Sequence, residues 1–97
     1  MSELSSTADV ATPDAARYAK QLLSHLGRKA DVRSGDGGDS LLFAGGSCLL
    51  QPQEEALHLV ATAPTEEALT TIESVVGSHL ERFGQRNELT VTWSREN

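Results

Sequence analysis

Residues 40–51 read SLLFAGGSCLLQ, and this stretch decides the fold. It contains two short apolar runs, 40–44 and 47–51, joined by Gly45 and Gly46. Short apolar runs separated by glycines are typical of paired strands, because glycine adopts the positive φ that tight turns need. The stretch therefore predicts two neighbouring strands of an antiparallel sheet in the middle of the chain.

Strand patterns continue on both sides of this pair. Residues 30–33 alternate between apolar and polar and lead into a Gly/Asp-rich hairpin loop at 34–39, while a polar loop at 52–55 is followed by an alternating run at 57–61. Alternation at a period of two places successive side chains on opposite faces of a sheet. The four predicted strands form a meander.

Helix patterns flank this meander. Thr12 and Pro13 suit the N-cap and first helical position of one helix, and Gly27 suits a left-handed cap at its end. Thr65 suits the N-cap of a second helix that extends to Phe83. Both segments carry apolar residues at the 3.6-residue helical period: Ala15, Ala19, Leu22, Leu23 and Leu26 in the first, and Leu69, Ile72, Val75, Val76, Leu80 and Phe83 in the second.

Two outer runs, 7–11 and 89–93, also alternate and are predicted as strands. The order β-α-β-β-β-β-α-β indicates an α+β two-layer sandwich with two helices on one face of a mostly antiparallel sheet. We expect one domain over residues 1–97, with an ordered core at about 7–94 and tails at 1–6 and 95–97.

Composition excludes several classes of function. The formal net charge is −6, which opposes the binding of a nucleic-acid backbone. No apolar run approaches the roughly 18 residues that a membrane-spanning helix needs. The single cysteine, Cys48, excludes an intrachain disulfide and favours a cytoplasmic location. We predict neither nucleic acid nor membrane as a partner.

Two tracts nearly repeat each other at the ends of the predicted helices, SHLGR at 24–28 and SHLER at 78–82. His25 with Arg28, and His79 with Arg82, are i,i+3 pairs that share a helix surface. The structural interpretation is that these cations complement the helix dipole, and the functional one is an anion or carboxylate site in which arginine supplies a planar fork and histidine a proton donor.

The spacing of the two tracts argues against a shared site. If an internal twofold relates them, they lie at opposite ends of the helical layer, about 20 Å apart for helices of this length. No pair such as Cys-x-x-Cys or His-x-x-x-His occurs, so we predict no metal and no cofactor.

Packing both helices on one face leaves apolar side chains on the other. Leu42, either Leu49 or Leu50, and Val60 are expected there with His58 beside them. This open face predicts an interface with a second copy of the chain or with a protein partner.

Four segments together resemble the DUF2218 family of small bacterial proteins: RYAKQL at 17–22 with the following Ser24 and His25, GSCLL at 46–50, HLERF at 79–83 and LTVTW at 89–93. The resemblance covers about residues 7–94. Members are frequent in actinobacteria and have no established function, and the resemblance implies for some an accessory role in iron-siderophore handling.

The predicted element order is also similar to the TATA-binding-protein-like fold, as in the C-terminal domain of phosphohexomutases. Residues 49–59 stand where that domain carries its phosphate loop and the strand after it, but Gln51 replaces the phosphate-binding arginine, and Gln53 and Glu54 replace its serine and glycine. Without the guanidinium fork and with an added carboxylate, the loop should repel phosphate.

No nucleophile with a neighbouring base is visible, so the sequence favours a non-catalytic binding or self-associating domain that uses the open sheet face. The alternative is a small enzyme or anionic-ligand-binding protein that uses the His/Arg pairs.

Overall fold

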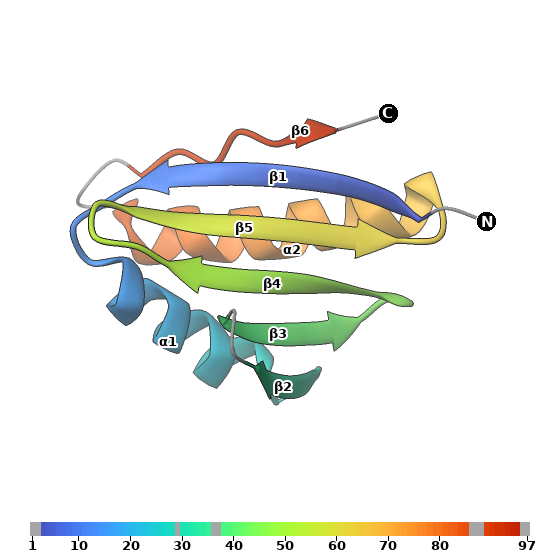
Figure 1. Ribbon diagram of the computed structural model, residues 1–97, viewed down its shortest axis with the longest axis horizontal. Coiled ribbons are helices and arrows are strands. Elements are labelled where there is room, and N and C mark those ends of the chain that lie inside the picture. Colours follow the sequence, from blue (N-terminus) through green and yellow to red (C-terminus); the bar gives the residue numbers. More distant parts are fainter. Residues whose placement is uncertain (1–2, 29, 36–37, 86–88, 96–97) are drawn as a thin grey trace.

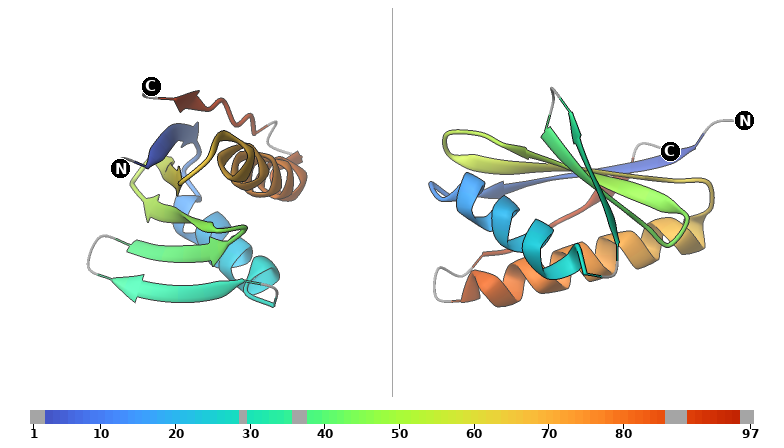
Figure 2. Two further views of the ribbon diagram at one scale, coloured as in Figure 1. Left: turned by 90° about the vertical axis from the view of Figure 1, so that its right-hand side faces the viewer. Right: turned by 90° about the horizontal axis from the view of Figure 1, so that it is seen from below.

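The computed structural model describes residues 3–28, 30–35, 38–85 and 89–95. Within these residues the chain forms a six-stranded sheet and two helices, and both helices lie on one face of the sheet (Figures 1 and 2). The helices are α1 (Ala15–Leu26) and α2 (Glu66–Phe83). The strands are β1 (Leu4–Ala11), β2 (Asp31–Gly35), β3 (Gly38–Phe43), β4 (Gly46–Pro52), β5 (Ala56–Ala63) and β6 (Ser94–Arg95). This confirms the predicted α+β class.

The strand order is β2-β3-β4-β5-β1-β6, and every pairing is antiparallel (Figure 1). The predicted meander is β2 to β5. β1 then pairs with β5 along its whole length, in the register Leu4 opposite Ala63 to Ala11 opposite Ala56. The first strand of the chain is therefore an inner strand of the sheet.

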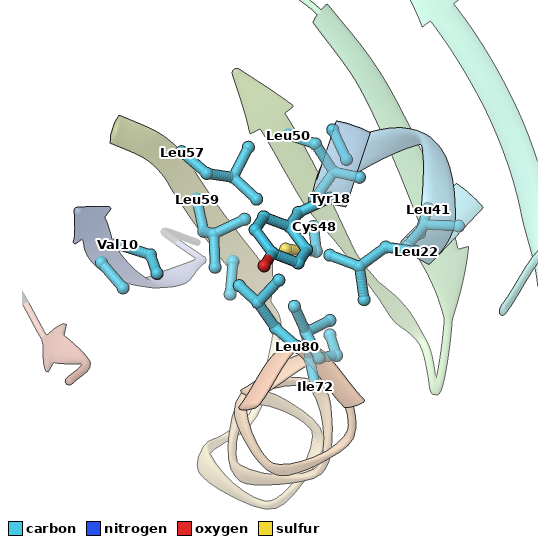
Figure 3. Close-up of a cluster of buried hydrophobic side chains, with 14 of the residues drawn as sticks. Val10, Tyr18, Leu22, Leu41, Cys48, Leu50, Leu57, Leu59, Ile72 and Leu80 are labelled. Atoms are coloured by element: carbon cyan, nitrogen blue, oxygen red, sulfur yellow. The ribbon is translucent and has the colours of Figure 1, made fainter. Parts of the chain in front are cut away.

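The core lies between the sheet and the two helices. Alternate strand residues such as Leu41, Leu50 and Leu59 are fully buried, and they meet Leu22 of α1 and Leu80 of α2 (Figure 3). The period of two in the strands and of 3.6 in the helices thus brings the apolar faces together. Full burial of a leucine side chain contributes roughly 1.5–3 kcal/mol.

The ends of the helices differ in how well the sequence predicted them. Thr65 is the N-cap of α2 as predicted, and its Oγ1 accepts a hydrogen bond of 3.1 Å from the backbone N–H of Ala68. For α1 the prediction was wrong: Asp14 is the N-cap, while Thr12 Oγ1 accepts a bond of 3.0 Å from the N–H of Asp14. Gly27 has φ −62°, so its predicted left-handed cap is also wrong, because the chain continues in a helical turn in which Ala30 N–H donates to the Leu26 carbonyl.

Both ends of the chain depart from the predicted boundaries. β1 begins at Leu4 rather than at residue 7, and Ser6, expected in a frayed tail, is completely buried. Residues 89–93 are not a strand: the final strand is β6, which pairs with β1 at Ser6 and Thr7 within the described part of the chain. Leu89 is nevertheless buried, and Trp93 packs against the core. The alternation of apolar residues in this segment therefore reflects side-chain packing against α2 and not pairing with a neighbouring strand.

Candidate functional site

A cleft of about 490 Å³ lies where the last turn of α1 meets the second half of α2. Its lining comes from both helices, from the segment that follows α1, and from β3: His25, Leu26, Arg28, Ala30, Phe43, Val75 and His79. The volume falls within the range of small-molecule sites, and such sites combine an apolar lining with a few polar groups.

The two histidines of the twin tracts meet at this cleft. The ring centroids of His25 and His79 are 5.0 Å apart, and the ring planes are tilted by 48°. The prediction that they lie about 20 Å apart is therefore wrong. That prediction assumed an internal twofold, but the two helices are not equivalent. α1 has 12 residues and α2 has 18, and the end of the shorter helix reaches the side of the longer one.

Contacts within α2 orient the ring of His79. Its Nδ1 lies 2.7 Å from the carbonyl oxygen of Val75, one helical turn earlier. A carbonyl oxygen only accepts hydrogen bonds, so Nδ1 carries the proton and donates it. In the neutral side chain, Nε2 of His79 then has its lone pair available.

Phe83 orients the ring of His25 from the other side. The two ring centroids are 5.6 Å apart with an interplanar angle of 81°, an edge-to-face arrangement that aromatic rings prefer. His25 is exposed, and neither of its ring nitrogens has a hydrogen-bond partner among the described residues. Both nitrogens are thus available to a ligand.

The two predicted arginines have different positions. Arg28 is exposed and lines the cleft, whereas Arg82 is exposed on α2 and is not among the described residues of the lining. The structure brings together three of the four predicted site residues. In a chain of net charge −6, the cleft gathers a guanidinium and two imidazoles at one place.

Sequence reasoning missed the apolar part of the cleft. Phe43 shares the helix-facing side of β3 with buried Leu41, and Val75 lies four residues before His79 on α2. The i,i+4 spacing of Val75, His79 and Phe83 was a signal that these side chains share one face of a helix. Which surface these side chains face depends on where α1 crosses α2. The local sequence pattern gives no information about that crossing.

The open sheet face has the predicted residues. Leu42, Leu49, His58 and Val60 alternate with buried neighbours and so point away from the helices, and Leu50 is the inward residue of its pair. Leu49 lies directly opposite Val60 in the ladder. These side chains are half-buried rather than exposed, and the exposed large apolar residue among the described ones is Val32 of β2.

His58 has a partner on this open face. Its Nδ1 lies 2.6 Å from Oδ1 of Asp9, its register partner on β1. The carboxylate accepts the hydrogen bond and becomes an ion-pair partner when the imidazole is protonated. The ring is held far from the His25–His79 pair by its position on the opposite face of the sheet.

Cys48 lies in the core. It is fully buried on the helix-facing side of β4, and burial raises the pKa of its thiol to about 12. Such a thiol behaves as a small apolar side chain instead of a nucleophile or metal ligand.

Across the described ranges, no three side chains among His, Cys, Asp and Glu come close enough to hold one metal ion. Neither described helix has an apolar stretch that is long enough to cross a lipid bilayer.

Comparisons with known proteins give a family and a fold. The profile of DUF2218, described as an uncharacterized protein conserved in bacteria, matches residues 7–94, so the chain belongs to this family. The NMR structure of PA4090 from Pseudomonas aeruginosa is similar with a TM-score of 0.77 and 28% sequence identity, and the match covers 94% of this chain and 95% of that one. A search of curated proteins gives no significant match.

Proposed function

We propose that this DUF2218 protein binds a small molecule with an anionic group and an apolar body in the cleft between α1 and α2. The observation that carries the proposal is the convergence of His25, His79 and Arg28 over one hollow. Arg28 offers a carboxylate or a similar anion a bidentate fork, His25 can donate to it from one ring nitrogen, and His79 can donate from Nε2 when its ring is protonated.

The floor of the cleft indicates the rest of the ligand. Phe43, Val75, Leu26 and Ala30 present carbon surface to the hollow. Burying apolar ligand surface contributes roughly 25 cal/mol per Å² before the entropic costs of binding. An aromatic or branched aliphatic acid therefore fits the site better than inorganic phosphate, which would leave the floor uncovered.

The twin tracts provide a matched pair of variants for testing this proposal. Arg28→Ala removes an arginine at the cleft, and Arg82→Ala removes its counterpart outside the cleft with the same change in charge. Titration of the ¹⁵N-labelled protein with benzoate, phenylacetate, acetate and phosphate should shift amide signals near residues 25–28 and 75–79. We expect affinity for the aromatic acids to fall about tenfold or more in Arg28→Ala, since charged hydrogen bonds contribute about 1.5–3 kcal/mol.

Equal weakening by the two arginine variants would attribute binding to net charge and contradict the proposal. The absence of shifts at the cleft with every acid at millimolar concentration would also contradict it. Chemical-shift fingerprints of the free variants verify that each one is folded.

We propose self-association through the open sheet face as a second candidate. Leu42, Leu49 and Val60 on three adjacent strands support it, although their half-burial leaves little apolar surface for a partner. Light scattering at increasing concentration should show a dimer that Leu49→Glu dissociates, and a monomer at millimolar concentration would rule this candidate out. A cytoplasmic location and a role in siderophore handling stay predictions from the free cysteine and from the resemblance.

A further inference from the structure

The paired imidazoles of His25 and His79 have a spacing that suits a metal ion. Two imidazoles on one tetrahedral zinc-like ion, each with a metal–nitrogen bond of about 2 Å, have ring centroids about 5 Å apart. The observed separation is 5.0 Å, with planes tilted by 48°. The rings thus lie near the separation that a shared ion requires before any ion is bound.

The hydrogen bond of His79 is of the kind that metal-binding histidines make. Ligating histidines commonly donate their second ring N–H to a carboxylate or a backbone carbonyl, which fixes the tautomer and orients the lone pair. Nδ1 of His79 donates to the carbonyl oxygen of Val75 at 2.7 Å, so Nε2 is the nitrogen that remains for a ligand.

The surroundings favour a cation at this position. The last turn of α1 contributes His25 to the cleft, and the C-terminus of a helix carries a partial negative charge that favours cations. Arg28 on the rim opposes a bare cation, but it would attract an anion bound to that cation. A metal ion with an anionic co-ligand therefore suits the site better than either one alone.

We propose that His25 and His79 bind one divalent transition-metal ion of the zinc and copper class, through Nε2 of His79 and one ring nitrogen of His25. No third protein ligand is present among the described residues, so water and the anionic group of the ligand fill the other coordination positions. This inference rests on the proposed function because it uses the same cleft, and it specifies how the anion is held.

The test is a calorimetric titration of the untagged full chain with Zn²⁺ at pH 7.5 in a non-coordinating buffer. A site with two protein ligands should bind one equivalent in the micromolar range, far more weakly than structural zinc sites with four ligands. Co²⁺ should give a visible absorption band, and Mg²⁺, which prefers oxygen ligands, should not bind.

Three histidine variants separate this site from unspecific binding. His25→Ala and His79→Ala should each weaken Zn²⁺ at least tenfold, whereas His58→Ala, which removes a histidine on the opposite face, should leave the affinity unchanged. If an alanine variant fails to fold, the Zn²⁺-induced shifts of the histidine ring protons in the unaltered chain give the same information: signals of His25 and His79 should move and that of His58 should stay. Equal weakening by all three variants, or a shift of His58 alone, would overturn the proposal.

A phenylacetate titration with and without EDTA distinguishes the two proposals. Zn²⁺ binding at the two histidines, with tighter phenylacetate binding in its presence, supports the inference. Phenylacetate binding that is unchanged by EDTA, together with no Zn²⁺ binding, overturns the metal site and leaves the anion-binding cleft intact. Zn²⁺ binding without any effect of phenylacetate overturns the proposed co-ligand.

Discussion

Arg95 holds Glu73 in a two-pronged contact: Nη2 donates to Oε1 at 2.9 Å, and Nε donates to Oε2 at 3.3 Å. Nη2 of Arg95 also donates a hydrogen bond of 2.7 Å to Thr70 Oγ1. Farther along α2, Glu81 Oε2 accepts a bond of 2.9 Å from the backbone N–H of Val91. The C-terminal segment is thereby tied to α2 at two places, with Trp93 beside Gly77 between them.

Replacing Glu73 should give a stability difference that depends on pH. The hydrogen bond from Arg95 holds the pKa of Glu73 below its ordinary value of 4.5. A carboxyl group whose pKa is lower in the folded than in the unfolded state stabilises the fold at pH values above its unfolded pKa. This stabilisation is lost as the pH falls through the pKa of the folded state. Glu73→Gln should therefore lower Tm by a few degrees at pH 7, with the difference shrinking below about pH 4.5.

Thermal unfolding followed by circular dichroism at several pH values measures this difference. Glu54→Gln, at an exposed loop position, is the control and should show little change. A Tm difference for Glu73→Gln that is as large at pH 3 as at pH 7 would contradict the assignment of the effect to ionisation.

Gly46 at the start of β4 has no room for a side chain. A Cβ there would collide with the carbonyl oxygen of Thr62, and it would lie 2.7 Å from Ile72 Cδ1 and 2.9 Å from Ala63 Cβ. A backbone carbonyl in a paired strand cannot move aside without disturbing the ladder. Gly46→Ala should lower the free energy of unfolding by about 1–3 kcal/mol in urea titrations.

Gly35 provides the comparison for that substitution. Among the described residues, a Cβ at Gly35 would meet only the Gly38 carbonyl oxygen, at an ordinary contact distance of 3.7 Å. Gly35→Ala should leave the unfolding midpoint nearly unchanged. Similar losses for the two variants would contradict crowding at Gly46 as the cause, because a glycine-to-alanine change by itself lowers the entropy of the unfolded chain and favours folding.

The thiol of Cys48 should be unreactive in the folded protein. It is fully buried with a pKa raised to about 12, so little thiolate exists at neutral pH and none of it is exposed to a reagent. Reaction with Ellman's reagent at pH 8 should be slow in buffer and complete within minutes in 6 M guanidinium chloride. Rapid labelling without denaturant would indicate that β4 opens easily.

Phe43 should determine preference for apolar acids. It contributes an aromatic ring to the cleft without a charge. Phe43→Ala should weaken phenylacetate binding severalfold and leave acetate binding nearly unchanged, because acetate covers little of the floor. Equal effects on both acids in the chemical-shift titration would show that the substitution disturbs the cationic rim instead.

The local signals of the sequence account for most of the fold. Thr65 and the apolar stripe of α2 predict that helix from start to end, and alternation around Leu41 and Leu59 identifies the buried face of the sheet. The sequence left open which of Leu49 and Leu50 points inward, and the structure shows that it is Leu50. These features depend on residues within a few positions of one another. These features can therefore be predicted without knowing how distant segments of the chain pack.

The meeting of His25 and His79 was not predictable in the same way. Each histidine was identified as a candidate, but their 5.0 Å separation depends on the crossing of α1 over α2, which is set by packing between distant segments. Likewise the period of two at Leu89, Val91 and Trp93 indicated which side chains turn inward. It did not reveal that side-chain contacts with α2, rather than a sheet neighbour, hold this segment.

The place of β1 in the sheet has a consequence for how the chain folds. β2, β3 and β4 each pair with the next strand along the chain, but β1 must pair with β5, whose last residue, Ala63, lies opposite Leu4. Contacts between segments so distant along the chain slow the folding of small domains to milliseconds or seconds. During synthesis β1 leaves the ribosome before β5 is made, so β1 has to wait for that partner.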